Sequence, residues 1–225
     1  MTGAAASTNA RVAKHAGITF AGIMGANVLN YVFYAFVSRV LGVELYGAFS
    51  SLLAIVIIAS APAQIAQMVV AKLATQYADD SDGLAGIVRA IDRATVAAGI
   101  VAAAVLGALS APIAAFLHLT DPLAVTFAAL ALGGAITLPF LRGVLQGTAS
   151  FTAFALSNLA EGFGKAAFAP LLGAVGGLRG ALGGMALGLL AASAYTYVAG
   201  HPHRRGTPTS FSLRTVVATS AGVAA

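Results

Sequence analysis

Long stretches without a charged residue decide which solvent this chain can fold in. The stretch from Ala16 to Ser38 carries no charge, and comparable apolar stretches follow along the rest of the sequence. Over the whole chain 59% of the residues are hydrophobic and only 8% are charged, whereas soluble domains carry about 25% charged residues. A water-soluble fold cannot bury so much apolar surface, so we predict an all-α polytopic membrane protein.

Charged residues divide the sequence into segments of membrane-spanning length, because about 20 residues of helix cross a hydrocarbon core of roughly 30 Å. Backbone amides at that depth must bond within their own segment, which favours helices. The alternation of apolar and polar residues that is typical of membrane strands is absent. We therefore predict a bundle of about six transmembrane helices, near residues 17–38, 47–71, 94–117, 122–141, 151–175 and 178–199.

The predicted bundle fills residues 17–200 and leaves a segment at each end. Residues 1–16 are predicted to be a cytoplasmic segment, because the apolar stretch after them is too long for a signal peptide. Residues 201–225 begin with a polar, proline-containing stretch and turn apolar again from Thr215. We interpret them as a cytoplasmic linker and the start of a truncated seventh helix, so the chain is expected to be a fragment.

Lysine and arginine gather on one side of the predicted bundle. Of the 12 such residues, only Arg39 and Arg179 fall opposite the N-terminus, and Lys165 falls inside a span. Cytoplasmic loops carry this excess, so we predict a multi-pass protein of the inner (plasma) membrane with a cytoplasmic N-terminus. The net charge of +5 forms no continuous basic patch with interleaved aromatics, so membrane lipids rather than nucleic acid are the expected partners.

Small residues at helical spacing predict close helix packing, because lipid tails give helices no hydrophobic drive to associate. One series repeats every four residues along the sixth predicted helix and comprises Gly176, Gly180, Gly184 and Gly188. A shorter series with the same spacing follows the fourth span and comprises Gly143 and Gly147.

Two opposite charges are predicted at membrane depth in the fifth span. Glu161 lies ten residues after residue 151, about 15 Å into the bilayer, and Lys165 follows one turn later. At this i, i+4 spacing the side chains share a helix face and can pair. Two interpretations stay open: a buried ion pair that fixes packing, or a site in which Glu161 couples transport to an ion and Lys165 binds substrate.

Uncharged amides and one arginine complete the candidate substrate-binding residues. Asn27 and Asn30 share one face of the first span, and Gln64 and Gln67 share one face of the second. Hydrogen bonding between helices is the alternative explanation for each amide. Arg39, at the end of the first span, either reaches toward lipid headgroups or faces a cavity and attracts phosphate.

Catalytic and metal-binding patterns are missing from the sequence. Without cysteine there is no disulfide or thiolate site, and no HExxH, GxSxG or P-loop motif occurs. Asp79, Asp80 and Asp82 lack the spacing of a calcium loop and indicate a solvated turn. We therefore predict no enzyme activity, no catalytic or metal-binding residue and no cofactor.

Two motifs resemble the Wzx-type flippases of the multidrug/oligosaccharidyl-lipid/polysaccharide exporter superfamily. Residues 37–53, VSRVLGVELYGAFSSLL, match that family's arginine, leucine-glycine and tyrosine-glycine pattern between the first two helices. Residues 138–170 resemble its fourth helix, its Arg-Gly and Gln-Gly turn, and a fifth helix with an internal Glu and a basic residue. The likeness extends over residues 15–200.

The resemblance implies a bundle that is one half of a flippase for undecaprenyl-pyrophosphate-linked oligosaccharide, used in surface polysaccharide biosynthesis. It implies that Arg39, Arg142 and Lys165 attract the pyrophosphate and that Glu161 occupies an acidic position of the fifth helix. The partners so implied are a C-terminal helix bundle and glycosyltransferases or a polymerase of the same pathway. Two alternatives stay open, namely a multidrug cation antiporter of the same superfamily and a non-transporting membrane scaffold.

Overall fold

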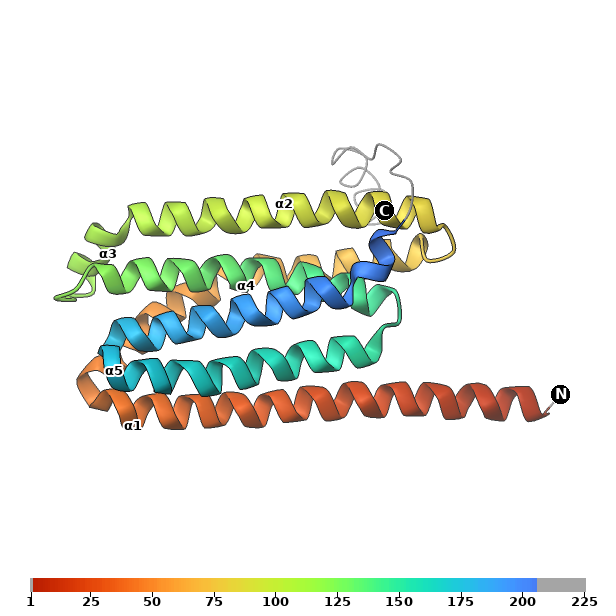
Figure 1. The fold of residues 1–225 in the computed structure, drawn as a ribbon, viewed down its shortest axis with the longest axis horizontal. Helices are drawn as coiled ribbons and strands as arrows, with labels where there is room; N and C mark the ends of the chain where they lie inside the picture. The colour runs from red at the N-terminus through yellow and green to blue at the C-terminus, as the bar shows by residue number, and fades with distance from the viewer. Residues whose placement is uncertain (1, 206–225) are drawn as a thin grey trace.

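The computed structural model describes residues 2–205, and in this range the chain is helical with short turns and no strand (Figure 1). The predicted all-α class is therefore confirmed. The predicted seventh helix from Thr215 lies outside the described residues. In chain order the elements are α1 (Thr2–Gln76), α2 (Ser81–Ala108), α3 (Ser110–Phe116), α4 (Leu123–Gly147), α5 (Phe151–Ala199) and the 3-10 helix η1 (His201–Arg204).

The number of long helices differs from the prediction. Among residues 2–205, four helices rather than about six are long and apolar enough to cross a membrane. The reason is that α1 and α5 each contain one non-helical glycine, Gly42 (φ 70°, ψ 177°) and Gly177 (φ 57°, ψ −136°). These dihedral angles suit glycine, which has no Cβ to clash with the backbone. Figure 1 shows each of the two helices reversing direction, so each contains two of the predicted spans.

We refer below to the first half (residues 2–41) and second half (residues 43–76) of α1, and to the first half (residues 151–176) and second half (residues 178–199) of α5. The sixth predicted span ends where α5 does, at Ala199.

The third and fourth predicted spans differ from the structure at their ends. Helix α2 begins at Ser81, well before residue 94, because Asp80 caps it by accepting a hydrogen bond of 3.0 Å from the Gly83 amide. The start of α2 at Ser81 agrees with the turn predicted at Asp79 and Asp80. Helix α4 runs six residues past the predicted end at 141, to Gly147. That extension moves Arg142 from a loop into the bundle.

The core lies between the second half of α1, α4 and the second half of α5, where the largest fully buried side chains include Phe49, Leu52, Leu182 and Met185. Outward-facing positions are apolar as well: Ile58 is 73% exposed and Phe116 is 80% exposed. An apolar exterior around long apolar helices is that of a multi-pass membrane protein.

Glycines bring the helices close together, as the sequence predicts. A Cβ at Gly188 would lie 2.6 Å from the Gly164 carbonyl carbon, and one at Gly184 would overlap the carbonyl of Phe168, so the two halves of α5 pack backbone to backbone. A Cβ at Gly143 would lie 2.7 Å from the Gln67 carbonyl oxygen on α1. Gly176 differs, because nothing lies within 4 Å of its added Cβ.

The turns divide between the two ends of the bundle. Figure 1 shows the N-terminus, the α1–α2 turn, the α4–α5 turn and η1 at one end. The reversals of α1 and α5 lie at the other end, together with α3. Residues 201–204, within the predicted linker, form η1, and Arg204 is buried there.

Candidate functional site

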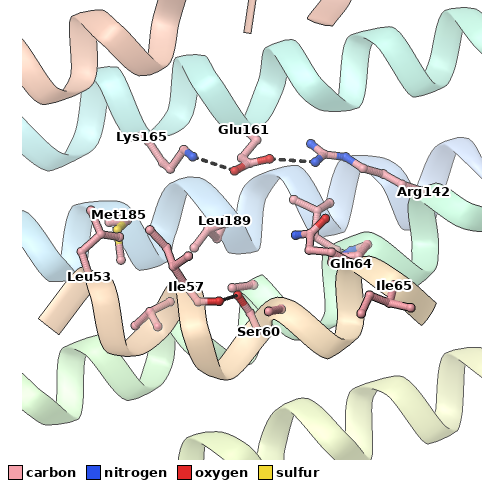
Figure 2. Close-up of a pocket in the computed structure, with 15 residues that line it drawn as sticks. Leu53, Ile57, Ser60, Gln64, Ile65, Arg142, Glu161, Lys165, Met185 and Leu189 are labelled. Atoms are coloured by element: carbon pink, nitrogen blue, oxygen red, sulfur yellow. Dashed lines mark hydrogen bonds and ion pairs between the residues drawn. The ribbon is translucent and has the colours of Figure 1, made fainter. Parts of the chain in front are cut away.

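Three charged side chains form a row inside the bundle, with Glu161 at its centre. Lys165 Nζ lies 2.6 Å from Glu161 Oε1, and Arg142 Nη1 lies 2.8 Å from Glu161 Oε2. Figure 2 shows Lys165 and Arg142 pointing toward Glu161 from opposite sides. The i, i+4 pairing predicted for Glu161 and Lys165 is confirmed. Both carboxylate oxygens are therefore occupied by cations.

Arg142 is fixed by more contacts than the ion pair alone. Its Nε donates to Ser157 Oγ at 2.9 Å and its Nη2 donates to the Ser157 carbonyl at 2.8 Å. Ser157 Oγ lies 2.6 Å from Thr196 Oγ1, and Thr196 donates in turn to the carbonyl of Ala192. The chain of hydrogen bonds joins α4 to both halves of α5. It fixes the guanidinium before any ligand arrives.

The row lines a pocket of about 360 Å³ between the second half of α1, α4 and both halves of α5. Most of the wall is aliphatic, and Figure 2 shows Leu53, Ile57, Met185 and Leu189 around the charged row. Gln64 and Ser60 add polar groups from α1. A mostly apolar pocket with a few convergent polar groups is the usual form of a ligand site.

The site has an excess of positive charge. Arg142 and Lys165 supply two positive charges and Glu161 supplies one negative charge, so the row carries a net charge of +1. The side chains are 10%, 14% and 20% exposed for Arg142, Lys165 and Glu161. Lys165 Nζ also lies 5.9 Å from the centre of the Phe33 ring, within cation–π range. Mutual pairing reduces the cost of burying these charges, and the excess cation is left to attract an anion.

The other predicted binding residues do not all meet at this pocket. Gln64 lines it, but Gln67 donates to Gln146 Oε1 at 3.2 Å. Asn27 is exposed and Asn30 half-buried on the first half of α1. Arg39 is exposed near the Gly42 turn and is not among the residues that line the pocket.

Sequence reasoning missed the residues that hold Arg142. Ser157 precedes Glu161 by four residues and so shares its helix face, which is a signal that the sequence did contain. Thr196 lies in the other half of α5 and gave no such signal, because only the reversal at Gly177 brings it beside Ser157.

A second buried ion pair lies at the end of the bundle near η1. Arg204 binds Asp92 through two hydrogen bonds of 2.6 and 3.1 Å, donates to the Tyr197 carbonyl at 2.7 Å and lies over the Tyr197 ring. Arg89 donates to the carbonyl of Arg204 at 2.6 Å. The contacts join α2 to the end of α5, and we assign them a structural role.

A second cavity, of about 540 Å³, lies at the opposite end beside Asp121, Arg179 and Glu44. Arg179 Nη2 donates to Asp121 Oδ1 at 2.7 Å, and the hydrogen bonds from Arg179 hold the pKa of the Asp121 carboxyl below its usual value. Within residues 2–205, no group of three or more His, Asp or Glu side chains is arranged to hold a metal ion.

Comparison with known proteins identifies the fold. No protein-family model matches the sequence, and no match is found among curated proteins. The structure is similar to that of a MOP superfamily transporter from Pyrococcus furiosus Vc1, with a TM-score of 0.64 and 16% sequence identity over 88% of this chain and 46% of that one. The chain has the fold of part of a MOP superfamily transporter. This chain spans less than half of that transporter's length. The binding pocket of that transporter is described as having reverse polarity, which suggests a different function for it.

Proposed function

We propose that this chain is the N-terminal helix bundle of a flippase that moves undecaprenyl-pyrophosphate-linked oligosaccharide across the membrane by alternating access. The observation that carries the proposal is the row Arg142–Glu161–Lys165, which gives a pocket at membrane depth a net positive charge. The fold likeness to a transporter supports transport rather than catalysis. The motifs at 37–53 and 138–170 support the choice of a lipid-linked glycan.

A pyrophosphate needs such a pocket to cross the bilayer. Burying about two negative charges in hydrocarbon costs several kcal/mol or more, even where water defects form. Arg142 presents a planar guanidinium that suits two phosphate oxygens, and Lys165 adds a compact charge. An interior-negative membrane potential favours outward movement of the anion by about 2.3 kcal/mol per charge per 100 mV.

Glu161 competes with the substrate for the same two cations, because its oxygens already accept from Arg142 and Lys165. An incoming pyrophosphate displaces the carboxylate, which is then left without a partner in a low-dielectric site. Uptake of H⁺ or a metal cation by Glu161 restores neutrality there. Glu161 is therefore the candidate for ion coupling.

The alternative of a multidrug cation antiporter fits the row less well. Such a transporter needs a carboxylate that is open to an organic cation, and both oxygens of Glu161 are already paired. A non-transporting scaffold needs no internal pocket, so the cavity at the charged row favours a transporter.

The N-terminus lies in the cytoplasm and the substrate moves to the periplasmic leaflet of the inner membrane. A second helix bundle forms the facing wall of the cavity, in keeping with the 46% of the related transporter that this chain covers. Glycosyltransferases or a polymerase of the pathway supply or consume the substrate.

Charge reversal at the row tests the proposal. In purified protein in lipid nanodiscs, Lys165→Glu and Arg142→Glu are expected to weaken the binding of undecaprenyl pyrophosphate at least about tenfold, or about 1.4 kcal/mol. Lys72→Glu is the matched control, because Lys72 is exposed and lies outside the pocket. In cells that depend on this protein, the row variants are expected to lose surface polysaccharide. Unchanged binding by correctly folded row variants removes the row from the mechanism.

A further inference from the structure

One face of the first half of α1 carries only uncharged polar and aromatic groups along four positions. Asn27, Asn30, Tyr31 and Tyr34 follow the i, i+3, i+4, i+7 spacing that places side chains on one side of a helix. We call this surface the amide–tyrosine face. It differs in chemistry from the charged row, to which it contributes no ionic group.

The amide–tyrosine face is open rather than packed. Tyr31 is 75% exposed, Tyr34 is 39% exposed and Asn27 is also exposed. None of the side chains that the structure describes forms a hydrogen bond with the side-chain amide of Asn27 or of Asn30. Tyr34 precedes the Gly42 turn by eight residues, about 12 Å of helix, so the face lies at membrane depth. Unpaired amides turned toward acyl chains cost about 2 kcal/mol or more each, so this face borders water or a ligand.

The face begins where the charged row ends. Phe33, beside Tyr34 with ring centres 4.9 Å apart, lies 5.9 Å from Lys165 Nζ. The helices pack tightly beneath the face, since a Cβ on Gly162 would lie 2.9 Å from Leu29 Cβ. The amide–tyrosine face lies outside the pocket that the row lines, and the buried Phe33 ring connects it to Lys165. A ligand whose anionic group sits at the row therefore reaches this face only with the part that extends beyond the pocket.

We infer that the amide–tyrosine face binds the carbohydrate part of the substrate, an inference that rests on the proposed function. A sugar ring presents a face of C–H groups that stacks on the electron-rich face of an aromatic ring, here Tyr31 and Tyr34. Its hydroxyls both donate and accept, and the side-chain amides of Asn27 and Asn30 supply both complements. The charged row binds the pyrophosphate, and the amide–tyrosine face binds the glycan beside it.

The test compares two probes on the same protein. Binding to nanodisc-embedded protein is measured for undecaprenyl pyrophosphate and for the same lipid carrying an N-acetylhexosamine disaccharide. The wild type is expected to bind the glycan-bearing lipid more tightly. Tyr31→Leu and Tyr34→Leu are each expected to remove most of that difference, about three- to tenfold, while binding of the glycan-free lipid stays unchanged. Tyr34→Phe keeps the ring and is expected to keep most of the preference.

Phe36→Leu is the matched control. Phe36 is an aromatic residue of the same helix, half exposed, and lies on the opposite side from Tyr34. It is expected to leave the binding of both probes unchanged. Equal affinity of the wild type for both probes, or an equal loss from Phe36→Leu and the tyrosine variants, overturns this inference and leaves the proposed function intact. If neither probe binds to the wild type, the proposed function itself fails.

Discussion

The guanidinium of Arg142 on α4 lies 2.8 Å from the carboxylate of Glu161 on α5 and also bonds Ser157 through two donors. Lys165, by contrast, reaches Glu161 from the same helix, and among the described residues Glu161 is its one hydrogen-bond partner. The two cations are therefore unequal: Arg142 ties separate helices together, and Lys165 supplies charge.

This inequality predicts different effects on stability. Arg142→Met is expected to lower the free energy of unfolding by about 3 kcal/mol, because it leaves Ser157 and one oxygen of Glu161 without their donor. Lys165→Met is expected to cost less than half of that. Thermal unfolding in detergent measures both. The double variant Arg142→Met, Glu161→Gln is expected to lose less than the sum of its single variants, and strict additivity would argue against coupling of the two side chains.

The pairing of Glu161 with Lys165 follows from the sequence, because a four-residue spacing on a helix fixes which face both occupy. The role of Arg142 does not follow in the same way. Hydropathy places the end of a span only within a few residues, and an end at 141 puts this arginine in a loop, whereas an end at Gly147 puts it in the bundle.

The reversals at Gly42 and Gly177 explain the difference in helix count. Hydropathy locates the two places where the chain leaves the membrane, but single glycines make these turns without a loop. The glycine series predicts close packing, because a missing side chain leaves room for a neighbouring backbone. The glycine series does not identify the neighbouring backbone. For Gly184 the neighbour is Phe168, which lies in the first half of α5 and is brought alongside by the reversal at Gly177.

The close packing of the α5 halves gives a prediction with an internal control. Gly184→Ala places a methyl group against the Phe168 carbonyl and is expected to destabilise the protein by about 1–3 kcal/mol. Gly176→Ala meets nothing within 4 Å and is expected to be neutral or slightly stabilising, since alanine favours helix over glycine. The fraction of protein that stays folded after heating in detergent distinguishes them. Equal losses in the two variants would contradict the backbone-to-backbone contact.

The buried pair of Asp92 and Arg204 is expected to hold η1 on α2. Its side chains are 11% and 8% exposed, so breaking the pair by Asp92→Asn or Arg204→Met is expected to cost about 3 kcal/mol or more. Hydrogen exchange of the amides in η1 should accelerate in either variant. Asp121→Asn, which breaks the pair with exposed Arg179, serves as the comparison and is expected to leave η1 protected. Protection of η1 that is unchanged in Arg204→Met would show that other contacts hold it.

His203 makes the same end of the bundle sensitive to pH. Its Nε2 lies 3.2 Å from Thr148 Oγ1 and 3.1 Å from Ser150 Oγ, which joins η1 to the α4–α5 turn. Partial burial and then the charge of Arg204 lower the pKa of His203 below its ordinary 6.5. Because the unfolded chain binds the proton more tightly, the contribution of His203 to stability is complete above pH 6.5 and is lost as the pH falls through the lowered pKa.

The melting temperature of the wild type is therefore expected to fall between pH 7.5 and pH 5 by more than that of His203→Gln, whose amide still bonds the two hydroxyls but does not titrate. Asp121 does not add to the change in melting temperature between pH 7.5 and pH 5. Its pKa is lowered from 3.8, so its contribution to stability is lost only below pH 5. A wild type and variant that lose stability in parallel over this range would assign the pH dependence to groups other than His203. The hydroxyls of Thr148 and Ser150 do not titrate here, so His203 is the group through which this contact responds to pH.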